Sequence, residues 1–212
     1  MADPVGSPSE QIDHSRRRLL TAATVAVGAV GVAFAAVPFI ASWEPSARAR
    51  ALGAPVSVDA SKLEEGQMLK VVYRGQPVFI VRRSKAVLAQ INDHNHLLAD
   101  PNQEDSTQPT YIKDAGPPRA RNPEYWVGYA LCTHLGCSPL GAFQPNDAYQ
   151  ILGTDLGHNW PGGFYCPCHG SKYDISGRVF KGMPAPKNLA VPSYTFAGDA
   201  HIVIGEDETA KS

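Results

Sequence analysis

Two short loops carry the residues of this chain whose types and spacing favour metal chemistry. The first loop, residues 132–137, has the sequence CTHLGC, and the second, residues 166–171, has the sequence CPCHGS. All four cysteines of the 212-residue chain lie in these loops, and each loop also contains a histidine. Together the loops offer two thiolates and two imidazoles to one site, with one further cysteine in each loop.

Three kinds of site are compatible with this set of residues. A Cys₂His₂ zinc site suits the ligand types, but the Cys-x-His spacing of the first loop is tighter than in usual structural zinc loops. A pair of structural disulfides fits the even number of cysteines, but it leaves the two histidines unexplained. A [2Fe–2S] cluster with two cysteines on one iron and two histidines on the other uses both residue types. The residues favour this third option and leave the other two open.

Both loops resemble those of the Rieske iron–sulfur proteins, in particular the kind found in cytochrome bc complexes. The resemblance implies that the first cysteine and the histidine of each loop bind the cluster. The implied ligands are Cys132 and Cys166 on one iron and His134 and His169 on the other. It further implies that the remaining cysteines, Cys137 and Cys168, form a disulfide between the loops.

The resemblance extends to residues that surround the ligands. Ser171 and Tyr173 occupy positions where the family places hydroxyl groups that donate hydrogen bonds to cluster or ligand sulfur. Residues 182–186, Gly-Met-Pro-Ala-Pro, resemble the proline loop that covers the cluster. Leu135 is expected either to contact the quinone or its pocket, or to pack beneath the first loop.

The mixed ligand set explains the chemistry that the resemblance implies. Two neutral imidazoles in place of thiolates remove negative charge from the cluster, so its potential exceeds that of plant-type clusters with four cysteines. Hydroxyl donors raise the potential further. An imidazole bound through one nitrogen leaves the other nitrogen at the surface. His134 and His169 are therefore the expected catalytic residues, which accept the proton of a hydroquinone while the cluster accepts one electron.

The N-terminal part of the chain predicts a membrane anchor. Residues 1–14 are polar and are expected to form a disordered cytoplasmic terminus. Three arginines at 16–18 precede an uncharged run from Leu19 to Trp43. At ~1.5 Å per residue these ~25 residues span ~37 Å, which suffices to cross the ~30 Å hydrocarbon core of a bilayer. We therefore expect a single transmembrane helix within residues 15–43.

The same arginines resemble a twin-arginine export signal. Residues 47–49, Ala-Arg-Ala, resemble a cleavage site, but the apolar run is longer than the ~7–15 residues of a cleavable signal. This length favours an uncleaved signal anchor. The arginines place the N-terminus in the cytoplasm and the remaining chain in the periplasm, where a disulfide can form. The expected location is thus the inner membrane of a bacterium.

Residues 44–55 are mostly small and are expected to form a flexible tether, and the resemblance implies that this tether is a hinge. The head, residues 56–212, is predicted to be all-β, with short antiparallel strands and a small cluster-binding subdomain. The expected strands lie at 56–58, 68–73, 78–82, 125–131, 191–196 and 201–204, with a turn at 74–77 and a hairpin at 173–180.

Three further segments of the head have weaker patterns. Residues 84–91 are expected to form a helical turn, and residues 157–164 are expected to lead into the second loop. Residues 92–123 are rich in Pro, Asp and Asn and are expected to lie on the surface as a loop. His94 and His96 within this loop are expected to be solvated rather than to bind a metal.

The resemblance implies an electron-transfer subunit of ubiquinol:cytochrome c oxidoreductase, which is not a complete enzyme alone. Its implied partners are cytochrome b, which forms the quinone pocket, cytochrome c₁, which accepts the electron, ubiquinol and the lipid membrane. Rieske ferredoxins and ring-hydroxylating oxygenases lack the extra cysteine pair. The Rieske subunit of another periplasmic enzyme, such as arsenite oxidase, is the alternative. A net charge of −1 gives no indication of nucleic-acid binding.

Overall fold

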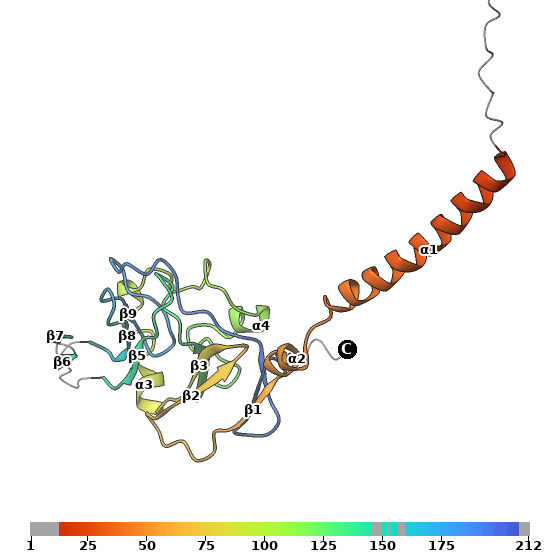
Figure 1. The fold of residues 1–212 in the computed structure, drawn as a ribbon. Coiled ribbons are helices and arrows are strands. Elements are labelled where there is room, and N and C mark those ends of the chain that lie inside the picture. The colour runs from red at the N-terminus through yellow and green to blue at the C-terminus, as the bar shows by residue number, and fades with distance from the viewer. Residues whose placement is uncertain (1–12, 146–149, 152, 157–159, 208–212) are drawn as a thin grey trace, which may run out of the picture. The chain divides into compact units, whose positions relative to one another are not determined.

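The structure is a computed structural model that describes residues 13–145, 150–151, 153–156 and 160–207. The expectations for residues 1–12 and 157–159 lie outside these residues. The chain divides into two compact units, Met1–Arg50 and Ala51–Ser212, which are described separately. Figure 1 shows the helices and strands of both units along the chain.

Helix α1 (His14–Ala41) contains the expected membrane anchor. Asp13 caps its first turn, since the side chain accepts hydrogen bonds from the backbone N–H groups of Ser15 and Arg16. The hydroxyl groups of Thr21 and Thr24 donate to carbonyl oxygens one turn earlier, which satisfies them within an apolar helix. With 28 residues and a mean hydropathy of 2.2, α1 is long and apolar enough to cross a membrane.

A short helix occupies the expected tether. Helix α2 (Ala47–Gly53) lies within residues 44–55, and the Ser46 hydroxyl accepts a hydrogen bond from the N–H of Ala49 in its first turn. The segment is therefore partly helical, and the expectation that it forms a flexible tether stays a prediction. Its small residues indicated flexibility, but alanine and arginine also have high helix propensity.

The head contains antiparallel sheets, as expected, and each main sheet has three strands. The first has the order β1 (Val56–Asp59), β11 (His201–Ile204), β10 (Tyr194–Phe196). The second has the order β2 (Met68–Tyr73), β3 (Gln76–Arg82), β4 (Tyr125–Tyr129). The third has the order β5 (Leu140–Phe143), β8 (Gly163–Tyr165), β9 (Lys172–Tyr173). A separate pair joins β6 (Gln150–Ile151) to β7 (Thr154–Asp155).

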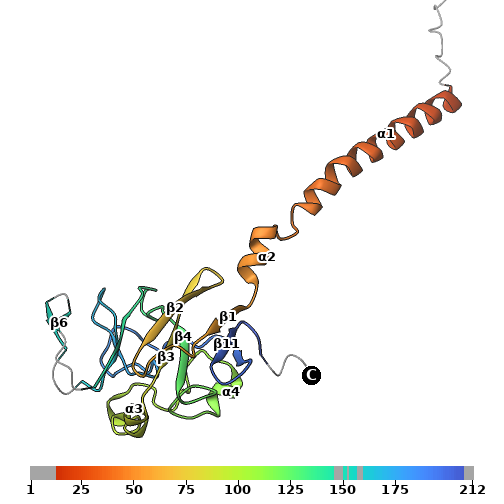
Figure 2. The ribbon, with the colours of Figure 1, turned by 90° about the horizontal axis from the view of Figure 1, so that it is seen from below.

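The third sheet and the β6–β7 pair lie at one end of the head, and β1 with β11 lies at the other (Figures 1 and 2). The second sheet connects the two ends through β3, which is buried on both faces. Phe79 and Val81 pack into the core beneath the third sheet, whereas Val78 and Ile80 pack into the core against the first sheet. Alternate residues of a strand point to opposite faces, so one central strand supports both cores.

Tight turns follow the predicted positions. Arg74 and Gly75 have φ values of 51° and 76°, as a two-residue hairpin between β2 and β3 requires. In the expected hairpin over 173–180, Tyr173 pairs with Val179. Gly177 has a φ of 69° at its tip, where the indole ring of Trp126 leaves no room for a Cβ atom.

The expectation that residues 92–123 form a surface loop was partly wrong. The preceding helix α3 (Lys85–Ala89) confirms the predicted helical turn. The segment itself contains the 3₁₀ helix η1 (Asn95–Leu97) and helix α4 (Thr110–Lys113). Leu98, Ile112 and Arg119 are fully buried. The segment is therefore part of the packed head.

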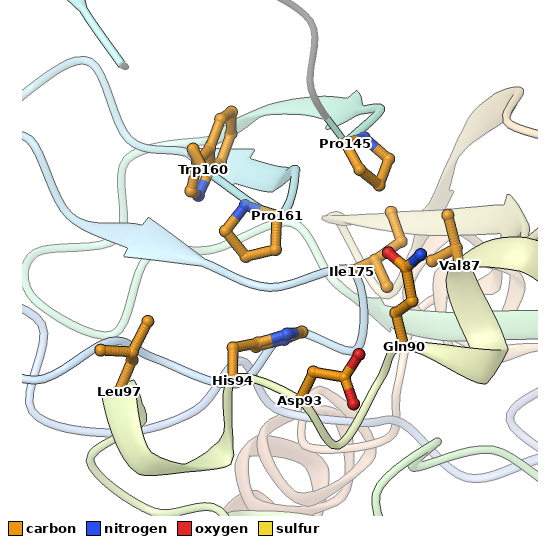
Figure 3. A pocket seen from close by; sticks show the side chains of 9 residues that line it. All are labelled: Val87, Gln90, Asp93, His94, Leu97, Pro145, Trp160, Pro161 and Ile175. Carbon is orange, nitrogen blue, oxygen red and sulfur yellow. The ribbon is translucent and has the colours of Figure 1, made fainter. Parts of the chain in front are cut away.

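His94 also differs from expectation, whereas His96 is exposed as predicted. The His94 side chain is only 13% exposed, and its ring stacks on Phe180. It borders a hollow of about 200 Å³ lined by Val87, Gln90, Asp93, His94, Leu97, Pro145, Trp160, Pro161 and Ile175 (Figure 3). The two loops at residues 132–137 and 166–171 contribute no residue to this hollow.

Candidate metal centre

The two loops have the same backbone arrangement. In the first, Cys132 N–H donates to the Cys137 carbonyl and Gly136 N–H donates to the Cys132 carbonyl. In the second, Cys166 N–H donates to the Ser171 carbonyl and Gly170 N–H donates to the Cys166 carbonyl. Gly136 and Gly170 have φ values of 80° and 78°, a conformation that favours glycine. Each loop thus presents its cysteine and histidine from an equivalent turn.

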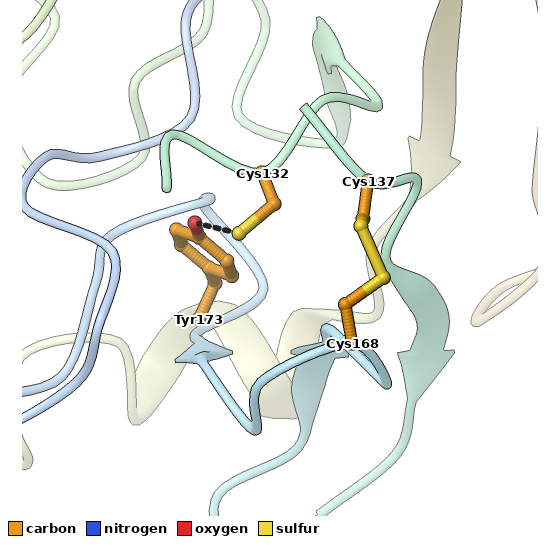
Figure 4. The surroundings of a disulfide bond; sticks show 4 residues. All are labelled: Cys132, Cys137, Cys168 and Tyr173. Atoms are coloured by element: carbon orange, nitrogen blue, oxygen red, sulfur yellow. Dashed lines mark hydrogen bonds between the residues drawn. A yellow bond between two sulfur atoms is a disulfide. The ribbon is translucent and has the colours of Figure 1, made fainter. Parts of the chain in front are cut away.

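A disulfide joins the loops. Cys137 and Cys168 are bonded, with Cα atoms 6.7 Å apart (Figure 4), which confirms the expected pair. Cys132 and Cys166 are free and buried, so a second disulfide is not formed between them. The sulfur atoms of Cys137, Cys166 and Cys168 lie within 4.8 Å of one another. Because two of them are oxidised, only Cys166 of this group is free to bind a metal as a thiolate.

The two loop histidines converge. The ring centroids of His134 and His169 are 4.7 Å apart, with an interplanar angle of 85°. The Nδ1 atom of His134 is buried and has no hydrogen-bond partner among the described residues. A buried, unpaired ring nitrogen requires an explanation, and a metal ion would supply it. Two buried thiols and two adjacent imidazoles therefore fit a [2Fe–2S] cluster with mixed ligands.

The electrostatics of the thiols agree with this fit. Burial raises the pKa of Cys166; the backbone N–H of Cys168 opposes this rise, and the hydrogen-bonded Cys132 thiol adds to it. Without a cation the Cys166 thiol therefore retains its proton. A bound metal ion reverses this preference and deprotonates coordinating thiols.

Tyr173 lies directly behind the first cysteine. Its hydroxyl group donates to Cys132 Sγ at 3.2 Å (Figure 4). Burial and the interaction with Cys132 raise the pKa of Tyr173 well above its usual range. The phenol therefore remains protonated and remains a donor at neutral pH. This position is the one expected for a hydroxyl beside a ligand sulfur, and its effect on a cluster stays a prediction.

Ser171 contacts the proline-rich segment 182–186. Its hydroxyl oxygen accepts a hydrogen bond from the Ala185 N–H at 3.1 Å, so it links the second loop to residues 182–186. Its own hydrogen remains for another acceptor. Leu135 is 71% exposed, which contradicts packing beneath the first loop. The proposed contact of Leu135 with quinone stays a prediction.

The sequence did not single out Thr133, which connects three parts of the site. Its N–H donates to the Tyr173 hydroxyl at 3.2 Å, and its Oγ1 donates to the Lys187 carbonyl at 2.6 Å. Thr133 thereby joins the first loop to the chain that follows residues 182–186. A hydroxyl residue between the two expected ligands Cys132 and His134 was the only signal in the sequence.

Comparisons with known families agree with this site. A family described as "Rieske [2Fe-2S] domain" matches residues 117–195, and one described as "Ubiquitinol-cytochrome C reductase Fe-S subunit TAT signal" matches residues 6–46. The second match confirms the predicted twin-arginine signal. Fold and site together define a Rieske [2Fe–2S] protein with an N-terminal apolar helix.

Full-length relatives define the family more narrowly. The "Ubiquinol-cytochrome c reductase iron-sulfur subunit" of Allochromatium vinosum is 50% identical over 199 residues, covering 94% of this chain and 92% of the relative. The protein of the same name from Blastochloris viridis is 44% identical over 198 residues, covering 93% and 96%. The chain belongs to the family of ubiquinol–cytochrome c reductase iron–sulfur subunits.

Among solved structures, the chain is similar to one titled "Hyperthermophilic respiratory Complex III". The sequence identity is 26% and the TM-score is 0.47, with 87% of this chain and 98% of that chain covered.

Proposed function

We propose that this chain is the electron-transfer subunit of a ubiquinol:cytochrome c oxidoreductase. The observation that carries the proposal is the convergence of His134 and His169 beside the buried Cys132 and Cys166, in two loops joined by a disulfide. The names of its relatives support the same activity. When bound, a [2Fe–2S] cluster supplies a one-electron acceptor whose potential is raised by its two neutral ligands.

The roles of the chain's own residues follow from their positions. Cys132 and Cys166 would hold one iron, and His134 and His169 would hold the other. The orphaned Nδ1 of His134 would bind the metal, which would leave its Nε2 to accept a proton from the hydroquinone. His169 is exposed, so its unbound ring nitrogen is also accessible to a substrate hydroxyl.

The surrounding residues orient and shield the site. Tyr173 donates to Cys132 Sγ and stabilises negative charge on that sulfur. Residues 182–186 cover the site and, through Ala185, are hydrogen-bonded to Ser171, which limits the access of water. Exposed Leu135 supplies an apolar contact for the quinone ring or the rim of its pocket.

The proposed partners are a cytochrome b subunit, which provides the quinone pocket, and a cytochrome c₁ subunit, which receives the electron. We place the N-terminus in the bacterial cytoplasm, because three arginines precede the apolar part of α1. The head then lies in the periplasm, where the Cys137–Cys168 disulfide is stable. Residues 44–55, including α2, act as the hinge that lets the head reach both partners.

Purification of the tagged full-length chain from detergent-solubilised membranes tests the proposal. We expect iron and acid-labile sulfide in equal amounts, b-type and c-type haem spectra in the same fraction, and quinol:cytochrome c activity. A chain that carried zinc in place of iron would contradict the cluster. An iron-loaded chain that co-purified with a molybdenum enzyme and no haem would instead support the arsenite oxidase alternative.

A further inference from the structure

Asn188 follows Lys187, whose carbonyl contacts Thr133. The Asn188 side chain forms hydrogen bonds with two separate segments of the chain. It is only 1% exposed. Its side-chain oxygen accepts from the Val179 N–H at 2.8 Å. Its amide nitrogen donates to the Asp100 carbonyl at 2.9 Å and to Ser106 Oγ at 2.7 Å. The segment 100–106 therefore provides the support on which Asn188 rests.

The support is itself well ordered by local hydrogen bonds. The carboxylate of Asp100 accepts from the backbone N–H groups of Glu104 and Asp105 and from the hydroxyl of Ser106. A side chain that accepts several local hydrogen bonds stabilises a compact turn. The Ser106 oxygen can thus accept from Asn188 while its hydrogen is directed to Asp100.

A continuous series of hydrogen bonds connects this support to the first cysteine. The Lys187 carbonyl, in the peptide that contains the nitrogen of Asn188, accepts from Thr133 Oγ1. Thr133 N–H donates to the Tyr173 hydroxyl, and the Tyr173 hydroxyl donates to Cys132 Sγ. The position of Asn188 therefore determines where Thr133 and Tyr173 lie relative to that sulfur.

The number of hydrogens on these groups determines which group donates and which accepts in each hydrogen bond. A threonine hydroxyl has one hydrogen, and Thr133 donates it to Lys187. Thr133 Oγ1 lies 3.3 Å from the Tyr173 hydroxyl oxygen. In a hydrogen bond between these two groups, Thr133 Oγ1 can therefore only be the acceptor. The phenolic hydrogen of Tyr173 is left for Cys132 Sγ or Thr133 Oγ1, and a thiolate is the stronger acceptor.

We propose that Asn188, supported by Asp100 and Ser106, is a positioning residue for the hydrogen bond from Tyr173 to Cys132. The inference rests on the proposed function, because it assumes that Cys132 binds the cluster. Removal of the Asn188 side-chain amide takes one hydrogen-bond partner each from the Asp100 carbonyl, Ser106 Oγ and the Val179 N–H, and it loosens the peptide that carries the Lys187 carbonyl. A weaker hydrogen bond to a ligand sulfur stabilises the reduced cluster less, so the potential falls.

Arg119 keeps the neighbouring peptide in place when Asn188 is changed. It is fully buried and donates to the carbonyls of Leu189 and Ser176 at 2.8 and 2.9 Å. Burial lowers the pKa of Arg119 to about 10, so it is still a cation at neutral pH. Loss of the Asn188 side chain should therefore loosen the chain locally and leave the head folded.

The experiment uses the full-length chain in detergent with its cluster. Ser106→Ala removes one acceptor of Asn188, and Asn188→Ala removes the whole link. Tyr194→Phe is the control, because Tyr194 is equally buried in the other core, where its hydroxyl accepts from the Arg121 N–H. Iron content, melting temperature, reduction potential and hydrogen exchange of the 182–189 peptide are measured for each variant.

We expect Ser106→Ala and, more strongly, Asn188→Ala to lower the potential and to speed exchange in residues 182–189, with iron retained. Tyr194→Phe should lower the melting temperature alone. The Asn188→Ala change should lose its effect on the potential when Tyr173→Phe is already present, because coupled residues are not additive. This loss of effect separates positioning through Tyr173 from general packing.

Variants that lowered only the melting temperature, as the control does, would overturn the inference. An additive effect of Asn188→Ala on the potential in the Tyr173→Phe background would also overturn it. If Asn188→Ala does not retain iron, Ser106→Ala decides by the same measurements. A wild-type chain without iron and sulfide would count against the proposed function, whereas unchanged potentials in iron-loaded variants would count only against the role of Asn188.

Discussion

His134 and His169 come from separate loops, yet their imidazole rings meet edge to face with centroids 4.7 Å apart. Each histidine lies within a glycine-dependent turn of the same hydrogen-bond pattern, and the disulfide between Cys137 and Cys168 joins the two turns. The pair is therefore fixed by backbone geometry and a covalent link. This arrangement is suited to binding one metal ion by two neutral ligands, and it leads to the first prediction.

Substitution His169→Ala should abolish the cluster. One iron would lose half of its protein ligands, and the reduced protein should no longer give the anisotropic EPR signal of a mixed-ligand [2Fe–2S] centre. His96→Ala is the matched control, since His96 is exposed and lies outside the loops. An intact EPR signal and full iron content in His169→Ala would refute the ligand assignment.

Substitution Tyr173→Phe should lower the reduction potential without loss of iron. The phenol donates one hydrogen bond to Cys132 Sγ, and a hydrogen bond contributes ~1 kcal/mol net. For a one-electron couple, in which ~59 mV corresponds to ~1.4 kcal/mol, the expected decrease is ~40 mV. Protein-film voltammetry measures it. Tyr165 is a buried phenol on β8, and Tyr165→Phe should leave the potential unchanged. Equal reduction potentials for the two variants would contradict the role of Tyr173.

Replacement of Cys137 and Cys168 by serine should reduce stability and iron content together. The disulfide links residues separated by 31 positions. In the chain-entropy account, closing such a loop stabilises the fold by about 3–4 kcal/mol. Thermal unfolding and iron analysis measure the two effects, and a reducing agent should reproduce them in the wild-type chain. A variant with the wild-type melting temperature and iron content would show that the cluster ligands alone secure the loops.

Asp174→Asn should destabilise the head at neutral pH. The carboxylate is buried and accepts hydrogen bonds at 2.7 Å from Arg178 Nε and from the Arg178 backbone N–H. Burial by itself would raise the pKa of Asp174, but the charge and hydrogen bonds of Arg178 outweigh it and hold the pKa below its usual value. Removing one partner of a buried ion pair costs about 3–5 kcal/mol.

The sign of the pH dependence follows from that depressed pKa. The stabilisation by Asp174 is complete above the unfolded pKa of ~3.9 and is lost as the pH falls through the lower folded pKa. Melting curves of the wild type and Asp174→Asn should therefore converge in acid. Asp59→Asn is the control, because the pKa of Asp59 is also lowered but the side chain is exposed. Parallel curves down to strongly acid pH would exclude the ion pair as the cause.

Proline at positions 49–51 should slow turnover and leave the cluster potential unchanged. These residues lie within α2, and three prolines would replace the helix by a stiff extended segment. The head could then no longer adjust its distance to both partners. Quinol:cytochrome c activity is measured, with Arg50→Ala as a control that preserves helix propensity. A wild-type rate in the proline variant would make the segment a passive spacer.

The chemistry of the site was predictable because its ligands are local in the sequence. Each loop contains a cysteine and a histidine within a few residues, so spacing and residue type alone indicate a metal site. The anchor was predictable for a similar reason, since a long uncharged run requires an apolar environment. Alternation of apolar residues indicated most strands, and the resemblance to the Rieske family added the disulfide pair.

Only the tertiary structure revealed the residues that support the ligands. Asp100 and Asn188 meet across 88 positions, and Thr133 and Lys187 meet across 54. His94, Asp100 and Ser106 belong to a polar segment that the sequence assigned to the surface. Polar side chains can be buried only where hydrogen-bond partners satisfy them. For Asp100 and Ser106 one of those partners, the Asn188 amide, comes from a distant part of the chain, and no local pattern encodes which distant residue will supply it.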